Sequence, residues 1–295
     1  MKFNNREDMI QLTPLWKGER FDDGRPRVPD IILRRMESVI TEEAWSVLWR
    51  NGYHFQFASD KWVRLHPGRR LIGRAVTGVF VPQRPDLHDY LMDYGHNEEG
   101  RIGAMNSWVI ETLVEDDVIV IDLFDKIYEG TYSGANLSTA IASRTKRGQV
   151  IWGGIRDAEQ IIDIPNFATF CRGMDPTGIR NVTLTGLNVP CRIGDATCMP
   201  GDVVLGTMTG VLFIPPHLAE EIVDHAERTH MREAFSHQRL REGIYNSSQM
   251  DTKWTEAIEA DFAEWRETHK FEDLVIDWDK EEKGGATEDE ETLLG

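Results

Sequence analysis

Three stretches of the chain are apolar enough to predict strands at the centre of a sheet. They are Leu71–Val81, Asp117–Leu123 and Gln149–Trp152, and all three contain several β-branched residues. Such runs are typical of strands that are covered on both faces. A helical pattern over residues 137–148 separates the second run from the third. This order predicts a β-α-β unit with parallel strands and a right-handed crossover.

Shorter apolar runs follow and alternate with glycine and proline turns. They predict further strands at Phe167–Phe170, Val182–Leu184, Val189–Ile193, Val203–Gly206 and Val211–Ile214. Strands that alternate with helical segments are typical of the α/β class. We therefore expect an α/β fold.

Helical patterns occur before, between and after these strands. One helix is predicted to begin at Asp30, and a second to run from an N-cap at Thr41 to Gly52. Residues 82–115 are predicted to be a long connection with a helix in its later part, and residues 158–162 a short helix.

Four segments follow from this pattern. Residues 1–40 form a polar arm and a helix, residues 41–227 hold the predicted strands, residues 228–276 form a helical extension, and residues 277–295 form an acidic tail. The arm is punctuated by proline and glycine, so we expect a partly ordered terminus or one that wraps a neighbouring surface. The tail is charged and free of aromatic residues, which predicts disorder.

The helical extension carries an apolar stripe. Trp254, Ile258, Phe262 and Trp265 recur three and four residues apart, so they share one face of a helix. We expect this face to pack against the body of the protein or against a second subunit.

Composition and charge exclude several classes of partner, site and cellular location. The formal net charge is −17, and no basic run stands out to neutralise phosphates, which argues against general nucleic-acid binding. Cys171, Cys191 and Cys198 have no CxxC spacing, so neither a disulfide framework nor a thiolate zinc site is expected. No apolar run is long enough to span a bilayer, and the first residues lack the apolar core of a signal peptide. We expect a cytoplasmic protein.

The candidate chemistry gathers at Gly148–Asp157. Gly153 and Gly154 permit a tight turn or a close backbone approach, and Arg156 and Asp157 follow just past the strand end. Ligands collect at this edge of open α/β sheets. Arginine offers a fixed cationic fork to a carboxylate or an enolate, and aspartate offers a hard oxygen ligand to Mg²⁺. A surface ion pair at the start of a helix is the alternative interpretation.

Two groups of histidines and acids are weaker candidates. The first group lies in the predicted connection and could line a site, although no metal spacing is matched; it consists of His88, Asp89, His96, Asn97 and Glu98. The second group falls on the helix predicted from residue 217; it consists of His217, His225, His230 and His237. These histidines do not repeat on one helix face, so we expect solvated side chains rather than a metal site.

Several short motifs resemble one family when they are taken together. They are G-x-N-L at Gly134–Leu137, G-G-x-R-D at Gly153–Asp157, P-G-D at Pro200–Asp202 and G-V-x-x-I-P at Gly210–Pro215. Their order and spacing resemble the RraA-like family, over roughly residues 41–227. That family includes the regulators of ribonuclease activity A and the 4-hydroxy-4-methyl-2-oxoglutarate and 4-carboxy-4-hydroxy-2-oxoadipate aldolases.

The resemblance implies a swivelling β/β/α fold that assembles as a homotrimer or homohexamer with sites at subunit interfaces. It implies that Arg156 holds the carboxylate and the keto or enolate oxygen of a 2-oxo acid, and that Asp157 is the one protein ligand of Mg²⁺ or Mn²⁺. It also implies that the backbone amides of Gly134, Ala135, Asn136 and Leu137 bind the pyruvyl carboxylate. A helix N-terminus offers free N–H groups to an anion, which agrees with that role.

This sequence departs from the family pattern at two places near the site. Many aldolases of the family carry an acid where this chain has Ala135, and the closing segment often reads D-x-D-G where this chain has Gly206–Gly210. Without the acid at position 135 we expect weaker metal binding or proton transfer. Glu98, or an acid from the C-terminal helices of a neighbouring subunit, is a possible replacement.

Three functions remain open on the sequence. The leading one is a metal-dependent lyase, an aldolase or decarboxylase that cleaves the C3–C4 bond of a 2-oxo acid through a metal-stabilised enolate. The second is a metal-dependent dehydratase or isomerase on a sugar-derived acid, favoured by the extra polar groups of residues 88–98. The third is a non-catalytic binding protein that resembles the ribonuclease regulators, favoured by the acidic surface and by Ala135.

Overall fold

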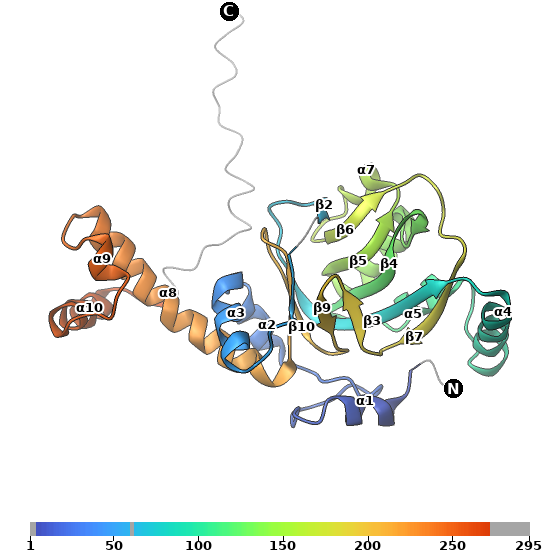
Figure 1. Cartoon of the computed structure of the whole chain (residues 1–295), viewed down its shortest axis with the longest axis horizontal. Coiled ribbons are helices and arrows are strands. Elements are labelled where there is room, and N and C mark those ends of the chain that lie inside the picture. Colours follow the sequence, from blue (N-terminus) through green and yellow to red (C-terminus); the bar gives the residue numbers. More distant parts are fainter. Residues whose placement is uncertain (1–3, 60–61, 272–295) are drawn as a thin grey trace, which may run out of the picture.

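A computed structural model describes residues 4–59 and 62–271 of the chain (Figure 1). The strands are β1 (Phe57–Ala58), β2 (Val63–Arg64), β3 (Leu71–Pro82), β4 (Asp117–Thr131), β5 (Gly148–Ile155), β6 (Ala168–Met174), β7 (Val182–Leu187), β8 (Cys191–Ile193), β9 (Ala196–Cys198), β10 (Val203–Gly206) and β11 (Val211–Ile214). The helices are α1 (Arg6–Leu12), α2 (Asp30–Met36), α3 (Thr41–Arg50), α4 (Pro85–Asp93), α5 (Met105–Ile110), α6 (Ala135–Thr145), α7 (Ala158–Ile161), α8 (Ala219–Arg241), α9 (Ser247–Met250) and α10 (Glu256–Thr268). A π-helix, η1 (Tyr94–Glu98), follows α4, and a 3-10 helix, η2 (Pro216–Leu218), precedes α8. The predicted acidic tail, residues 277–295, lies outside the described residues.

A nine-stranded mixed sheet forms the body, in the order β1-β11-β10-β3-β4-β5-β6-β2, with β7 also paired to β3. The four central strands β3, β4, β5 and β6 are parallel to one another. The outer pairs are antiparallel, and β8 and β9 form a separate two-stranded sheet. Helix α6 connects the parallel neighbours β4 and β5, as the β-α-β pattern predicts. The α/β fold class is confirmed.

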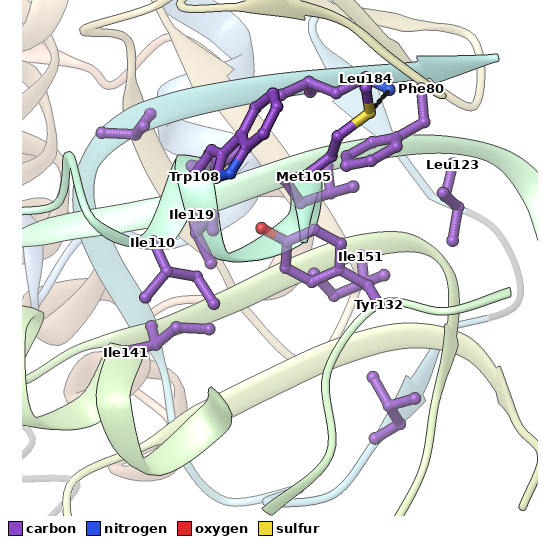
Figure 2. Packing of buried hydrophobic residues seen from close by; sticks show 14 of the residues in the cluster. Phe80, Met105, Trp108, Ile110, Ile119, Leu123, Tyr132, Ile141, Ile151 and Leu184 are labelled. Atoms are coloured by element: carbon purple, nitrogen blue, oxygen red, sulfur yellow. Dashed lines mark hydrogen bonds between the residues drawn. The ribbon is translucent and has the colours of Figure 1, made fainter. Parts of the chain in front are cut away.

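Alternate residues of the parallel strands bury against opposite layers. On one face Ile119, Ile121 and Ile151 pack with α5, α6 and α7. Figure 2 shows this cluster, in which Tyr132 and Trp108 fill the space between the sheet and the helices. On the other face Val118, Val120 and Val150 pack against the β8–β9 hairpin. The continuous apolar character of these strands therefore reflects cover on both faces.

The N-terminal and C-terminal helices meet on the β10–β11 side of the sheet. Helices α2, α3 and the first half of α8 share one apolar cluster with these strands; its members include Leu33, Val47, Leu205, Leu212 and Val223. Segments that are far apart in the sequence thus close the same side of the body.

The predicted apolar stripe of the extension packs on the second half of α8 and not on the sheet. Trp254, Ile258, Phe262 and Trp265 surround Phe235 in the second half of α8. Figure 1 shows α9 and α10 at the end of α8 that lies away from the sheet. Since all four side chains are at most 8% exposed, the stripe is already covered within the chain and gives no reason to expect a second subunit there.

The N-terminal arm is held to the sheet by a buried ion pair. Both guanidinium Nη atoms of Arg25 donate to the carboxylate of Asp117 at the start of β4, at 2.9 and 3.2 Å. Arg25 Nε also donates to Asp23, and the two side chains of the central pair are 1% and 0% exposed. The described part of the arm is therefore fixed on its own body, beginning with α1, which the sequence did not predict.

Both predicted ends of α3 were wrong, and its N-cap differs because Thr41 makes contacts with a distant segment of the chain. Ile40, not Thr41, is the N-cap of α3, and Glu43 accepts the Ile40 amide. The hydroxyl of Thr41 instead contacts Thr207 and Thr209 in the β10–β11 turn, at 2.7 and 2.8 Å. The helix also ends at Arg50, before Gly52. This threonine cluster occupies the segment where many aldolases of the family read D-x-D-G.

The P-G-D motif builds a buried turn. Gly201 has a φ of +84°, which favours glycine, and an added Cβ would lie 2.6 Å from Pro26 Cδ of the N-terminal arm. Asp202 is buried, and its carboxylate accepts the Met199 amide at 2.8 Å. Burial raises the pKa of Asp202 to about 7, and the Met199 hydrogen bond opposes this rise. The motif therefore shapes the junction of arm and sheet.

None of the helices in the described part of the chain is both long and apolar enough to cross a lipid bilayer.

Replacing Arg25 by Met should destabilise the fold strongly. The change leaves the Asp117 carboxylate buried without its cation, which typically costs about 3–5 kcal/mol. Arg27→Met is the matched control, because its pair with Glu19 is exposed and should cost about 1 kcal/mol or less. Urea unfolding of both variants measures this, and equal losses would contradict the anchoring role of Arg25.

Asp202→Asn should become more stable relative to the native protein as the pH rises. An unfolded aspartate has a pKa of about 3.9, so between about pH 4 and pH 7 the carboxyl ionises in the unfolded state while the folded state keeps its proton. Rising pH therefore favours unfolding of the native protein over this range. Between about pH 5 and pH 8 we expect the variant to gain roughly 2–3 kcal/mol in relative free energy of unfolding. Parallel stability curves for the two proteins would refute the assignment.

Candidate functional site

The end of β5 and the start of α6 lie side by side at the carboxyl edge of the parallel strands. The Tyr132 amide donates to Gly154 O at 2.9 Å, and the Arg156 amide donates to Ser133 O at 3.0 Å. Two backbone hydrogen bonds thus continue the β4–β5 pairing beyond the regular ladder. They bring Gly134, the N-cap of α6, next to Arg156 and Asp157.

This approach is possible because residue 134 has no side chain. A Cβ built on Gly134 would lie 2.3 Å from Asp157 Oδ2 and 2.8 Å from Arg156 Nε. Any other residue would displace one or both functional groups. The glycine of the G-x-N-L motif and the R-D of the G-G-x-R-D motif are therefore parts of one structure.

Arg156 and Asp157 are accessible and lie close to each other. Arg156 Nε is 3.7 Å from Asp157 Oδ2, and the two side chains are 47% and 41% exposed. Asp157 has a φ of +57° and a ψ of +37°, a left-handed conformation that is uncommon for a residue with a side chain. This turn reverses the chain from β5 into α7 and presents the carboxylate toward the start of α6.

Asp157 is oriented by the helix that it faces. The Ala135 amide, the first N–H of α6, donates to Asp157 Oδ2 at 3.1 Å. The first N–H groups of a helix have no acceptor within the helix. With the Ala135 amide engaged, the amides of Asn136 and Leu137 are the ones that the geometry of α6 leaves for an anion.

Buried polar contacts fix the segment before α6. Tyr132 OH donates to Asn106 O at 2.8 Å, and Asn106 Nδ2 donates back to Tyr132 O at 3.0 Å. Ser133 Oγ donates to Gln149 Oε1 at 2.9 Å, and Gln149 Nε2 donates to Ser138 Oγ at 3.3 Å. The sequence analysis missed all five of these residues. Polar residues inside an otherwise apolar strand, as Gln149 is, are the signal that could have identified them.

The donor set at Asp157 fits a cation that keeps most of its waters. Mg²⁺ is commonly bound through one or two carboxylates together with several waters. Asp157 offers an accessible carboxylate whose Oδ2 is held by the Ala135 amide. Among residues 4–59 and 62–271, Asp157 belongs to no group of three possible His, Cys, Asp or Glu ligands. The residues present therefore fit a hydrated hard ion and not a site enclosed by protein ligands.

The predicted glycine turn is a strand. Gly153 and Gly154 belong to β5, which runs to Ile155. An added Cβ at Gly153 would lie 2.8 Å from Leu123 Cβ, and one at Gly154 would lie 3.0 Å from Ile127 O. The strand β4 bulges between Asp122 and Thr131 and passes close to these glycines. Close backbone approach, the other possibility that the sequence allowed, explains them.

The histidines and acids of residues 88–98 lie on helices, not on a loop. His88 is in α4 and contacts Thr183 Oγ1 at 3.0 Å, and His96 in η1 contacts Gly103 O at 3.0 Å. Glu98 ends η1. Figure 1 shows α4 and α7 well apart on the body. A replacement of the acid missing at Ala135 by Glu98 stays a prediction.

A pocket of about 350 Å³ lies beside α4. Its lining includes His88, Asn106 and Arg180. None of the six predicted site residues lines it, and among the candidates at residues 88–98 only His88 borders this separate cavity.

Three of the four histidines in the second group, His217, His225, His230 and His237, are not simply solvated. His217 contacts Tyr53 OH at 3.2 Å, and His225 contacts Ser46 Oγ at 3.0 Å. His230 Nε2 lies 3.2 Å from Glu43 Oε1. The prediction failed because it considered each side chain only along its own helix, whereas α8 lies against α3.

Comparison with known proteins agrees with this architecture. Protein DlpA of Legionella pneumophila is 27% identical over 188 residues, which are 63% of this chain and 28% of DlpA. A protein of Halalkalibacterium halodurans named as a 4-hydroxy-4-methyl-2-oxoglutarate aldolase is 30% identical over 116 residues, 38% of this chain and 52% of that protein. The chain thus spans about half or less of the length of these two relatives.

A solved structure matches over a larger share of the fold. RraAS2 of Streptomyces coelicolor, named as an unusual member of the RNase ES inhibitor RraA protein family, is 25% identical with a TM-score of 0.61. The match covers 73% of this chain and 98% of RraAS2. Residues 49–213 match the family model described as RraA-like, Aldolase/RraA. Strands β1 to β10, most of β11, α6 and the Arg156–Asp157 turn fall within that match, and the chain belongs to the RraA-like family.

Proposed function

We propose that this protein is a divalent-metal-dependent lyase that cleaves the C3–C4 bond of a 2-oxo acid. The reaction is retro-aldol cleavage to pyruvate, decarboxylation of oxaloacetate, or both. One observation carries the proposal: the start of α6, the guanidinium of Arg156 and the carboxylate of Asp157 meet at one accessible edge of the sheet. An anion site, a fixed cation and a hard metal ligand are thus adjacent.

The amides at the start of α6 would bind the C1 carboxylate of the substrate. The Asn136 and Leu137 N–H groups lie at the positive end of the helix, which favours an anion. The Ala135 amide has another task in this proposal, because it holds Asp157 in place. In this proposal Gly134 lets the start of α6 approach Arg156 and Asp157 closely, and substrate binding does not require a hydrogen bond from its amide.

Arg156 would stabilise the charge that develops during cleavage. When the C3–C4 bond breaks, its electron pair remains on C3 and is delocalised onto the C2 oxygen. In the retro-aldol reaction the C4 hydroxyl gives up its proton to water and the C4 fragment leaves as a carbonyl compound, whereas in the decarboxylation the C4 carboxylate leaves as carbon dioxide. A proton delivered to C3 completes pyruvate. A guanidinium that lies next to the carboxylate site can pair with the C2 oxygen and stabilises it more as the charge grows.

Asp157 would hold Mg²⁺ or Mn²⁺. When bound, such an ion supplies Lewis-acid polarisation of the 2-oxo group and lowers the pKa of its waters. A single protein carboxylate suits an ion that keeps its waters, and an accessible position suits exchange of those waters for substrate oxygens. We also propose assembly as a homotrimer or homohexamer, on the family resemblance alone.

A non-catalytic binding protein is the second candidate. Arg156 and Asp157 lie 3.7 Å apart and are exposed, which is also the geometry of a simple surface ion pair. The position next to them is Ala135 instead of an acid, and RraAS2 is named for an inhibitor family. Dehydration of a sugar acid gains no support, because among the candidates at residues 88–98 only His88 lines the pocket beside α4, and no predicted site residue lines that pocket.

A coupled assay for pyruvate separates these candidates. The protein is incubated with oxaloacetate or a 4-hydroxy-2-oxo acid, with Mg²⁺ or with a chelator. The lyase proposal predicts Mg²⁺-dependent pyruvate from at least one of the two. Absence of metal-dependent turnover on both would contradict it and favour the binding protein.

Gly134→Ala should impair the site without unfolding the protein. The added Cβ meets Asp157 Oδ2 and the Nε and Cγ atoms of Arg156. Both side chains are partly exposed and can rotate away, so stability should change by about 1 kcal/mol or less. Displacement of the reacting groups by about 1 Å can cost on the order of 100-fold in turnover. Gly178→Ala is the control, because its Cβ meets nothing within 4 Å. Equal turnover in the two variants would show that the close approach of Gly134 to Arg156 and Asp157 is unimportant for catalysis.

Arg156→Lys should lower turnover more than it weakens substrate binding. Lysine keeps the charge but loses the two-pronged geometry, and loss of one such donor typically costs about 10²–10³-fold in turnover. Arg156→Ala should be worse and should also raise the Michaelis constant. Steady-state kinetics on oxaloacetate, with melting curves for both variants, are the measurement. Unchanged turnover in the lysine variant would fit a surface ion pair instead.

A further inference from the structure

A second cluster of possible metal ligands lies between α3 and α8, outside the proposed active site. It consists of Glu43 from α3 and of His230 and Glu233 from α8, with one ligand atom from each within 4.8 Å of the others. His230 and Glu233 are three residues apart and therefore lie on the same side of α8. The cluster joins the body to the helix that carries α9 and α10 (Figure 1).

Glu43 directs an unsatisfied oxygen into this cluster. The residue is 4% exposed. Its Oε2 accepts the Ile40 amide at 3.0 Å, whereas Oε1 is buried and accepts no hydrogen bond. Buried carboxylate oxygens normally have a partner or coordinate a metal. This oxygen lies within ion-pair distance of His230 Nε2 but has no hydrogen-bond donor, which leaves its lone pairs able to coordinate an ion.

The distance to His230 fits coordination of one ion. His230 Nε2 lies 3.2 Å from Glu43 Oε1 without forming a hydrogen bond to it. Two ligand atoms that are each about 2.0–2.1 Å from a tetrahedral zinc ion lie about 3.3 Å apart. The ring of Phe271 stacks on the His230 ring at 6.0 Å between centroids and restrains its plane. Burial lowers the pKa of His230, which favours the neutral imidazole that binds metals.

Neighbouring charges are compatible with a dication. The charges of Arg70 and Glu233 shift the pKa values of both Glu43 and His230. The charge of Glu42 shifts the pKa of Glu43 as well. Burial raises the pKa of Glu43 to about 7, and a bound dication would favour its ionised form. With Glu43 and Glu233 ionised and Arg70 charged, these three side chains carry a net negative charge, opposite to that of the ion.

We infer that Glu43, His230 and Glu233 form a binding site for a borderline transition-metal ion, with Zn²⁺ as the expected occupant. One imidazole nitrogen and two carboxylate oxygens favour such an ion over Mg²⁺. The ion links α3 to α8 at the point where α8 leaves the body. It therefore restrains the helical extension and has no part in the reaction proposed at Asp157.

The test is Zn²⁺ titration by calorimetry on full-length protein that has been stripped with a chelator and carries no histidine tag. We expect one Zn²⁺ per chain, and a higher melting temperature with Zn²⁺ than without it. His230→Gln and Glu233→Gln should each weaken binding at least about 100-fold, since even outer-shell partners of a metal typically contribute 10- to 100-fold. The control His237→Gln, an exposed histidine of the same helix, should bind as the native protein does.

Asp157→Asn distinguishes this site from the proposed active site. It should keep the Zn²⁺ stoichiometry and the Zn²⁺-dependent melting shift, whatever happens to turnover. Conversely, His230→Gln should lose both while it keeps Mg²⁺-dependent activity, if the lyase proposal holds. No Zn²⁺ binding by the native protein, unchanged binding by His230→Gln, or binding that only Asp157→Asn removes would overturn the inference.

Discussion

The geometry of the candidate site depends on the close approach of two backbone segments that lie about twenty residues apart in the sequence. The β4–β5 pairing extends through Tyr132 and Ser133, and it brings Gly134 against the side chains of Arg156 and Asp157. Without that approach the Ala135 amide could not reach the Asp157 carboxylate. Because Gly134 has no side chain, the start of α6 can lie next to the Arg156 guanidinium and the Asp157 carboxylate.

The rest of the fold holds these two segments in place. The apolar faces of β4 and β5 are covered on both sides, which fixes the register of the strands. The Arg25–Asp117 pair attaches the N-terminal arm at the beginning of β4, and the buried Asp202 turn meets the same arm at Pro26. The P-G-D motif, one of those that carry the family resemblance, joins the N-terminal arm to the sheet in this structure.

The sequence predicted much of the fold because its central strands are covered on both faces and are therefore continuously apolar. Strands β3, β10 and β11 lie close to their predicted positions. Short edge strands such as β1 and β2, with two residues each, carry too little periodicity to be recognised. The sequence left a tight turn and a close backbone approach both open at Gly153 and Gly154, because glycine in a strand and glycine in a turn look alike until the neighbouring bulge of β4 is known.

Contacts between distant segments could not be predicted from local patterns. Residues 134–137, 156 and 157 were identified through motifs, and the structure brings them together. The Ala135 amide was expected to bind substrate, whereas it contacts Asp157. Glu43 and His230 were missed because they lie far apart in the sequence and meet only when α8 packs on α3. The Trp254–Trp265 stripe was assigned to the wrong surface for a similar reason, since its partner is the second half of α8.

The most direct test of the central claim is binding of oxalate, a dianion that resembles the enolate of pyruvate. Calorimetric titration of the native protein and of Asp157→Asn, each with and without Mg²⁺, measures whether the helix start, Arg156 and Asp157 act as one site. We predict oxalate binding by the native protein that requires Mg²⁺, and at least about tenfold weaker binding by Asp157→Asn in Mg²⁺, because the ion bridges ligand and carboxylate. Equal oxalate affinity of the two proteins, or no binding by the native protein in Mg²⁺, would contradict the account.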